Sequence, residues 1–309
     1  MMAPANIAAS VRQRLLNLAR AENRPFNELL QYYAMERYLY RLSRSGHSER
    51  FILKGALVLR VWSFPAQRST MDIDLLGRTS NRPEDVSEVI REIMDVDAEA
   101  DGLVYSPASV RAERITEDAE YDGIRIRFEV RLDTAKIFMQ VDIGFGDAVH
   151  PAPVVAELPT ILGDPAPRLL CYSRESVVAE KLEAMARHGE LNSRMKDFYD
   201  LWQLSKQYDF EGETLAEAVR LTFERRERAR SRSLAAFSST FIETKQVQWD
   251  AFRHRSRLGQ APDSFREVVA ELEEFLVPVL TGFEAADGQQ GWRWRWIAAK
   301  GWEGREISP

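Results

Sequence analysis

The sequence contains a single cysteine, Cys171, among 309 residues, so no internal disulfide is possible and a reducing compartment fits. No apolar run approaches the roughly 18 residues that a membrane-spanning helix requires. The N-terminal residues lack the basic start and apolar centre of a signal peptide. The net charge of −6 does not announce a nucleic-acid partner, although overall charge can hide a local basic patch. These absences predict a cytoplasmic protein that does not enter a membrane.

Hydrophobic residues make up 45% of the chain and charged residues 29%, an ordinary globular composition. The pattern changes at a proline-rich stretch over 151–172, which we interpret as a connecting segment. Strands and helices are mixed before it, whereas helical periodicity dominates after it. The sequence therefore predicts two domains, over 1–150 and 151–309.

Apolar spacing also predicts the individual elements. We expect Asn23 to cap the second of two N-terminal helices and Asn81 to cap a later helix. The tail over 291–302 alternates tryptophan with arginine, which predicts a terminal strand packed on another element. The expected elements are helices within 8–45, a strand, glycine turn and helix within 51–62, a strand over 69–77, a helix over 81–97, hairpin strands over 125–132 and 136–145, and helices over 174–189, 193–208, 215–231 and 264–280.

Two aspartates interrupt the apolar run RSTMDIDLL over 68–76. Side chains two residues apart on a strand point to the same face, so Asp72 and Asp74 are expected to be neighbours, with Met71, Ile73 and Leu75 facing the core. Unpaired charges there are costly. Either the strand is an edge with one face in water, or the two carboxylates hold a cation such as Mg²⁺.

Asp142 is a third carboxylate on an apolar strand, in the run IFMQVDIGF. Three carboxylates on adjacent strands can hold a pair of metal ions for in-line phosphoryl or nucleotidyl displacement. The alternative is a hairpin residue that faces solvent.

The run FILKGALVLR places Gly55 between a predicted strand and a predicted helix, and backbone N–H groups at such a junction attract phosphate. Lys54 and Arg68 add positive charge nearby, and Ser69 offers a hydroxyl. These four residues are candidate nucleotide-binding residues, although glycine after a strand is common.

Lys181 precedes Gly189 by eight residues and Asp197 follows it by eight. In an antiparallel helical hairpin, positions equidistant from the turn lie level with each other. We therefore expect Lys181 to face Asp197, either in a functional site or in an interhelical salt bridge of small worth.

Two arginine-rich stretches are candidate phosphate-binding surfaces. The segment over 10–51 carries a local charge of +4, and FERRERARSR over 223–232, expected to be helical, carries five arginines. In both cases a solvated helical face is the competing interpretation, with i,i+4 pairs such as Glu224 with Arg228 in the second.

These motifs together resemble the AbiEii/AbiGii-type nucleotidyltransferase toxins of toxin–antitoxin systems, a group that includes the MenT toxins. The resemblance runs from Phe51 to Trp202. It is carried by Lys-Gly, Arg-x-x-x-Asp-x-Asp, a later strand aspartate, Glu-Lys and Lys-Asp-x-x-Asp-Leu in this order.

The resemblance implies an α+β fold, with a polymerase-β-like nucleotidyltransferase core (a mixed sheet flanked by helices) and a largely helical C-terminal domain. It implies that Asp72 and Asp74 bind Mg²⁺ (or Mn²⁺) and the triphosphate, with Asp142 as the least secure metal ligand. Lys181 and Asp197, contributed by the C-terminal domain, are then also needed for activity. Family members add nucleotides from an NTP to the 3′ end of tRNA, which stops translation, and a cognate antitoxin restrains them.

One departure concerns the Gly-Gly or Gly-Ser that usually follows the first strand, which is here Gly55-Ala56. The missing hydroxyl leaves phosphate contact to backbone N–H groups, Lys54 or Arg68. A metal-dependent nuclease and a phosphotransferase acting on a protein remain alternatives, as does a binding protein that has lost activity.

Overall fold

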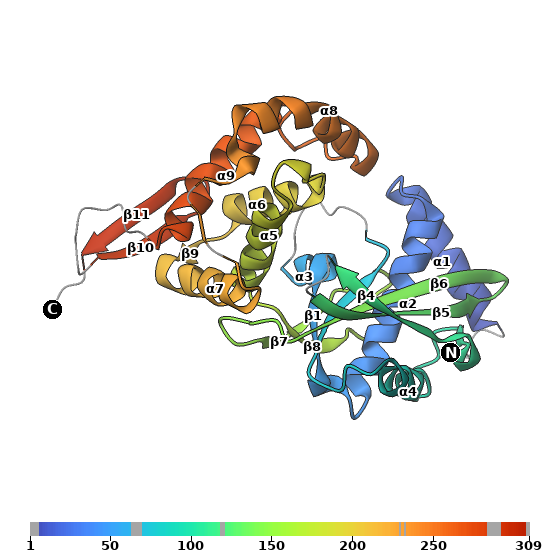
Figure 1. Ribbon diagram of the computed structural model, residues 1–309. Helices are drawn as coiled ribbons and strands as arrows, with labels where there is room; N and C mark the ends of the chain where they lie inside the picture. The colour runs from blue at the N-terminus through green and yellow to red at the C-terminus, as the bar shows by residue number, and fades with distance from the viewer. Residues whose placement is uncertain are drawn as a thin grey trace. The chain divides into compact units, whose positions relative to one another are not determined.

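The computed structural model describes residues 6–62, 70–117, 121–228, 230–231, 233–282 and 292–306, and the chain divides into two compact units (Figure 1). The first unit comprises Met1–Asp147 and Pro153–Tyr172, and the second comprises Ala148–Ala152 and Ser173–Pro309. The proline-rich segment that we interpreted as a connection thus returns to the first unit, where it forms two strands.

An eight-stranded mixed sheet forms the centre of the first unit, in the order β3-β5-β6-β2-β1-β8-β7 with β4 paired to β5. β2 lies parallel to β6, and β1 lies parallel to β8. The expected α+β core, a mixed sheet flanked by helices, is confirmed. Its elements are α1 (Ile7–Ala21), α2 (Phe26–Arg44), β1 (Phe51–Lys54), α3 (Gly55–Val61), β2 (Ile73–Gly77), α4 (Pro83–Met94), β3 (Leu103–Tyr105), β4 (Arg111–Glu117), β5 (Tyr121–Leu132), β6 (Ala135–Phe145), β7 (Val154–Glu157) and β8 (Arg168–Cys171), with short 3-10 turns at Ser48–Arg50 and Pro107–Ser109.

Helix α2 covers one face of this sheet. The ring of Tyr38 lies 5.2 Å from that of Phe128 on β5, and Gln31 donates hydrogen bonds to the carbonyl oxygens of Met71 and Phe138. Strand residues that face this way, such as Ile126 and Met139, are buried, whereas alternate residues are not. Period-two burial therefore leaves the opposite face of β5 and β6 polar.

Neither of the asparagines that we expected as helix caps occupies the N-cap position, which is held by Pro25 at α2 and by Arg82 at α4. Asn23 lies beyond α1 in the left-handed conformation (φ 51°), where asparagine is well tolerated, and α2 begins directly after Pro25. At α4, Pro83 occupies the first turn, and the Ser80 hydroxyl accepts a hydrogen bond from the backbone N–H of Arg82. A proline thus lies at the start of both helices.

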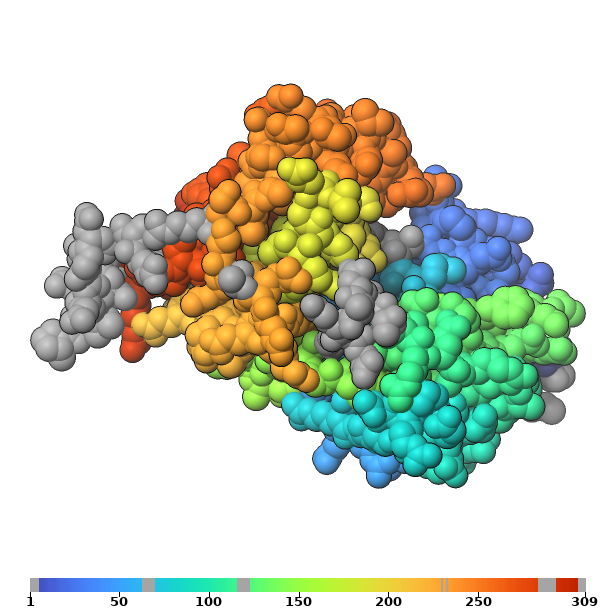
Figure 2. Space-filling view, viewed as in Figure 1, coloured from blue at the N-terminus to red at the C-terminus, as the bar shows by residue number. Residues whose placement is uncertain are grey.

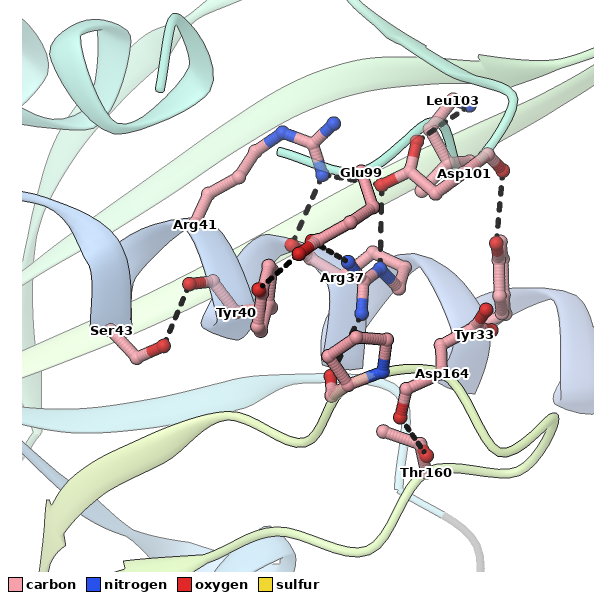
Figure 3. Close-up of polar contacts among 11 residues, drawn as sticks. Tyr33, Arg37, Tyr40, Arg41, Ser43, Glu99, Asp101, Leu103, Thr160 and Asp164 are labelled. Carbon is pink, nitrogen blue, oxygen red and sulfur yellow. Dashed lines mark hydrogen bonds and ion pairs between the residues drawn. The ribbon is translucent and has the colours of Figure 1, made fainter. Parts of the chain in front are cut away.

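Two arginines of α2, Arg37 and Arg41, are internal (Figure 3), so they are not available to the phosphate-binding N-terminal face that we considered, whereas Arg44 on the same helix is exposed. Arg37 is 1% exposed, and its Nε lies 3.4 Å from Oδ2 of Asp101; Nη1 of Arg41 lies 2.5 Å from the same oxygen. The other Asp101 oxygen accepts from the backbone N–H of Leu103, and Tyr33 donates to the Asp101 carbonyl. The network anchors the segment before β3 to α2, so these charges have a structural use.

Glu36 on α2 gives a pH-dependent prediction. Its Oε2 accepts from the backbone N–H of Ile161, while Oε1 is buried without a hydrogen bond, and burial raises the pKa of this carboxyl to about 8. A raised folded pKa contributes stability at low pH that is lost as pH rises from about 4.5 through 8. Glu36→Gln replaces this carboxyl group with an amide, which stays neutral at every pH. In urea unfolding at pH 9, the free energy of unfolding of Glu36→Gln should exceed that of wild type by roughly a few kcal/mol. At pH 5 the two proteins should have similar free energies of unfolding. A difference that does not vary with pH would contradict this.

The second unit is largely helical, as expected. Its elements are α5 (Arg174–His188), α6 (Met195–Gln207), β9 (Phe210–Glu211), α7 (Gly212–Arg225), α8 (Ser239–Ser256), α9 (Phe265–Leu280), β10 (Trp292–Ile297) and β11 (Gly301–Glu306), with 3-10 turns at Gly189–Leu191 and Ala235–Phe237. Helix α8 is not among the elements predicted from the sequence.

The tryptophan-rich tail forms part of a small sheet of order β11-β10-β9. The Trp296 ring centroid lies 4.8 Å from that of Phe275 on α9, and its indole N–H donates to the Ser205 carbonyl at 2.7 Å. The expectation of a terminal strand packed on another element is confirmed. Across the described part of the chain, none of the helices is sufficiently long and apolar to traverse a bilayer.

Candidate functional site

Strand β2 begins at Ile73, four residues later than the sequence suggests, and Asp72 lies immediately before it. Ile73 and Leu75 are buried, whereas Asp72 and Asp74 are half-buried. Met71, which we expected in the core, is 46% exposed because it lies before the first residue of the strand. Asp74 thus interrupts an otherwise buried strand, and Asp72 lies at its start.

Four charged residues form a line across four neighbouring strands, which we call the charged row. Lys54 on β1 pairs in register with Asp74 on β2, Asp74 pairs with Asp142 on β6, and Asp142 pairs with Arg125 on β5. Register partners share a face and have Cβ atoms about 5 Å apart. Two carboxylates are therefore direct neighbours at the centre of the row, with one cation on either side.

Arg125 holds the Asp142 carboxylate with two hydrogen bonds, each 2.8 Å long. The hydrogen-bonded Asp142 raises the pKa of Arg125, and the nearby charge of Asp72 acts in the same direction. Gln140 also donates to Asp142, at 3.2 Å. This bidentate geometry fixes the orientation of Asp142. Arg125 was not among the residues predicted from the sequence.

Lys54 at the other end of the row is held by a buried carboxylate. Its Nζ lies 2.7 Å from Oδ2 of Asp147, whose side chain is 2% exposed. The Tyr172 hydroxyl donates to the same oxygen at 3.4 Å, and the Lys54 ammonium lies 5.6 Å from the Tyr172 ring centroid. Asp147 and Tyr172, also missed at the sequence level, thus fix the position of the lysine beside Asp74.

Gly55 follows Lys54 and starts α3, as the sequence predicts. Its φ of +67° favours glycine, and a Cβ built at this position would lie only 1.9 Å from Oδ2 of Asp74. The Asp74 carboxylate therefore rests against the backbone of Gly55. Both the strand-to-helix turn and the position of Asp74 require a residue without a side chain.

The other two candidate nucleotide-binding residues, Arg68 and Ser69, lie outside the described residues. Within the part of the chain that the structure describes, no three or more His, Cys, Asp or Glu side chains are grouped in a way that would bind a metal. Mg²⁺ in nucleotide sites commonly uses only one or two carboxylates together with substrate phosphates. Asp72 and Asp74 fit that donor set.

The helical pair in the second unit is assembled as the spacing predicts. Lys181 on α5 lies 2.7 Å from Asp197 and 2.8 Å from Asp200, both on α6, and Arg194 lies 2.6 Å from Asp197. Both aspartates are at most 3% exposed. Burial alone would raise the pKa of Asp197, but the charges of Lys181 and Arg194 outweigh it and hold that pKa well below its ordinary value. Asp200, one helical turn from Asp197, was not predicted.

The arginine-rich stretch over 223–232 does not continue as the helix that we expected, and two of its arginines face a buried carboxylate rather than solvent. Helix α7 ends at Arg225, and the following Arg226 and Arg228 form ion pairs with Glu183, which is fully buried on α5. Glu224 pairs with Arg220 rather than with Arg228. The ion pairs fasten this segment to α5, because a buried carboxylate requires partners.

Comparison with known proteins yields one family match. The family model described as "Nucleotidyl transferase AbiEii toxin, Type IV TA system" matches residues 37–271. The range includes the charged row and the Lys181 pair.

Two solved structures show a distant likeness, both from Helicobacter pylori. A protein assigned as a nucleotidyltransferase has a TM-score of 0.45 and 14% identity, and the alignment covers 82% of this chain and 95% of that chain. The protein JHP933 has the same TM-score and identity, with 83% and 93% covered. Among curated proteins, none matches this chain.

Proposed function

This chain belongs to the family of nucleotidyl transferase AbiEii toxins of type IV toxin–antitoxin systems and is a nucleotidyltransferase, and we propose that it transfers nucleotides from a nucleoside triphosphate to an RNA 3′ end. The acceptor is the 3′ end of tRNA, and the consequence is a block of translation. A cognate antitoxin counteracts this activity, and toxin and target meet in the cytoplasm.

The observation that carries the proposal is the pairing of Asp74 with Asp142 at the centre of the charged row. Like charges directly opposite each other on neighbouring strands are destabilising. Their retention on a sheet whose other face is apolar is explained by a function that needs concentrated negative charge. The flanking Lys54 and Arg125 supply positive charge for the phosphates of a triphosphate.

Asp72 and Asp74 would hold Mg²⁺ (or Mn²⁺). When bound, the metal neutralises charge on the triphosphate and polarises its phosphorus–oxygen bonds. Asp142, oriented by Arg125, is the third carboxylate and positions the attacking 3′-hydroxyl.

The remaining residues bind the triphosphate. The backbone N–H groups at Gly55, the ammonium of Lys54 and the side chains of Arg68 and Ser69 contact its phosphates. The RNA 3′-oxygen then attacks the α-phosphorus in line, the bond to the β-phosphate oxygen breaks, and pyrophosphate leaves. We propose that Lys181 and Asp197 of the second unit are also required for transfer, as the family resemblance implies.

The experiment is incubation of the protein with total tRNA, a magnesium salt and each α-labelled triphosphate in turn. The label should appear in RNA lengthened at its 3′ end. Periodate-oxidised tRNA, which lacks the 3′-hydroxyl, should remain unlabelled. Shortening of RNA without triphosphate would contradict the proposal, as would transfer of a γ-phosphoryl group to a protein.

A further inference from the structure

An exposed phenylalanine lies on the polar face of the first unit's sheet. Phe138, the fourth residue of β6, is 74% exposed, whereas its neighbours Ile137 and Met139 on the opposite face are buried. The folded chain thus leaves an aromatic ring in water on a strand that could have carried a polar residue. The strands β4 to β6 lie at the surface, in green in Figure 2.

Phe138 shares its face with the charged row. Phe138, Gln140 and Asp142 alternate along β6 and point the same way. Asp142 lies four positions after Phe138, which corresponds to about 13 Å along a strand. An RNA strand whose 3′ end lies at Asp142 and which runs back along β6 would therefore pass over Phe138 within a few nucleotides.

Cations outnumber anions on the part of this face that extends from the charged row past Phe138. Arg127, Arg131 and Lys136 are 53%, 56% and 54% exposed. Arg111 pairs in register with Arg127, so it adds a fourth positive charge. Two acidic side chains of these strands, Glu113 and Glu129, form ion pairs with these cations, and Asp133 is exposed in the turn between β5 and β6. The local excess is positive in a chain whose net charge is −6.

We infer that this face of β4, β5 and β6 binds the single-stranded RNA segment that leads to the reacting 3′ end. A base stacks on Phe138, and phosphates contact Arg127, Arg131 and Lys136. Exposed aromatic rings on a sheet, flanked by arginine and lysine, are a common means of binding single-stranded RNA. The inference rests on the proposed function, since it gives the acceptor of that reaction a path to Asp142.

A protein partner suits this face less well. Cores of protein interfaces gather apolar residues and are depleted of charged ones. Here charged side chains surround the aromatic ring, and the exposed Val104 on β3 pairs in register with Arg131, which sets a charge beside it. The combination of one ring with exposed cations favours nucleic acid.

Three substitutions of Phe138 test the stacking contact. Binding of a labelled single-stranded RNA and of labelled tRNA to the full chain is measured by fluorescence anisotropy. Phe138→Ala and Phe138→Leu should weaken binding about tenfold, because neither side chain stacks on a base, while Phe138→Trp should bind as wild type does. Val247→Ala is the matched control, since Val247 is 76% exposed on α8. Binding of a fluorescent triphosphate should be unchanged in all four variants.

A second pair of variants tests the charge contact. Arg131 and Arg266 are 56% and 57% exposed, and each forms an ion pair with a glutamate, at 3.1 and 3.2 Å. Arg131→Gln should weaken RNA binding and reduce the slope of log K against log salt by about 0.7, the value for one phosphate contact in a single strand. Arg266→Gln should change neither.

If wild type extends RNA while Phe138→Ala and Arg131→Gln bind it normally, the inference is overturned and the proposed function stands. The inference is also overturned if Phe138→Ala binds RNA normally but no longer binds another protein that wild type binds. That result would assign the face to a protein partner. If wild type neither binds nor extends RNA, the proposed function has failed, and this inference fails with it.

Discussion

Gly55→Ala is expected to lose nucleotidyl transfer by about 100-fold or more, because a displacement of about 1 Å at a reacting group has an effect of that size. The added Cβ would lie 1.9 Å from Oδ2 of Asp74, so the carboxylate or the turn must move. The variant also holds alanine at φ +67°, which is unfavourable by roughly 1–2 kcal/mol. Transfer of labelled nucleotide and thermal unfolding measure the two effects separately.

Gly163→Ala is the matched control for the backbone term. Gly163 has a φ of +75°, but a Cβ there meets no atom within 4 Å. Gly163→Ala should therefore lose about as much stability as Gly55→Ala does, and it should transfer nucleotide at the wild-type rate. If Gly55→Ala transfers nucleotide at the wild-type rate, Asp74 does not need its observed position, and the account of the charged row is wrong.

Lys181→Met is expected to lower the free energy of unfolding by about 3–5 kcal/mol. The substitution removes the cation that Asp197 and Asp200 share, and both carboxylates are buried. Urea unfolding at neutral pH measures the loss. Lys206→Met on α6 is the control, because Lys206 is 34% exposed and pairs with Glu271 at 2.9 Å. The free energy of unfolding of Lys206→Met should fall by no more than about 1 kcal/mol.

The pH dependence of the Lys181 effect has a defined sign. The folded-state pKa of Asp197 lies below its ordinary value, so its contribution to stability is present above the unfolded pKa, about 4. That contribution is lost as pH falls below this value. In Lys181→Met, less positive charge opposes the effect of burial on Asp197, so its pKa is lowered less. The difference in the free energy of unfolding between this variant and wild type should therefore shrink toward low pH. A difference that grows on acidification would contradict the assignment.

Lys181→Arg separates a structural role from a catalytic one. Arginine keeps the positive charge that stabilises Asp197 and Asp200, but its planar guanidinium does not reproduce the point charge of an ammonium group. A stably folded and inactive Lys181→Arg variant would support a requirement for Lys181 in transfer. Full activity in this variant would show that transfer does not need the ammonium group itself and that a positive charge at this position is sufficient.

Local spacing predicted the parts of the fold and site that depend on near neighbours in sequence. The strand, glycine turn and helix around Gly55 are confirmed, because the turn needs a residue free of a side chain. The pairing of Lys181 with Asp197 is confirmed at 2.7 Å, because a helical hairpin brings equidistant positions together. Each feature follows from the sequence pattern on either side of one glycine, Gly55 for the turn and Gly189 for the helical hairpin.

Arg125 was missed because the register of the hairpin depends on the length of its turn. A three-residue turn, Asp-Thr-Ala, would set Ile126 opposite Asp142. The structure has a two-residue turn with Asp133 at φ 53°, and this pairs Arg125 with Asp142. A shift of one residue reverses the faces of a strand, so the partner of the carboxylate could not be predicted without the turn.

Contacts between distant segments left no local signal. Arg226 and Arg228 lie more than 40 residues from Glu183, and a run of arginines predicts a solvated or phosphate-binding helix unless the buried carboxylate is known. Residues 154–157 and 168–171 lie in a proline-rich stretch, yet their strands complete the sheet beside β1. Tertiary pairing decided both cases against local propensity.

The most direct test of the proposed transfer site is the rate at which Asp72→Ala, which removes the carboxylate two residues before Asp74 of the charged row, transfers labelled nucleotide to tRNA. Asp97→Ala is the control, because Asp97 is an exposed aspartate of the same unit. We expect Asp72→Ala to lose about 1000-fold or more in rate, since several kcal/mol of charge stabilisation depend on a metal ligand, with unchanged thermal unfolding and with Asp97→Ala fully active. Transfer by Asp72→Ala at the wild-type rate would show that the reaction takes place elsewhere on the molecule.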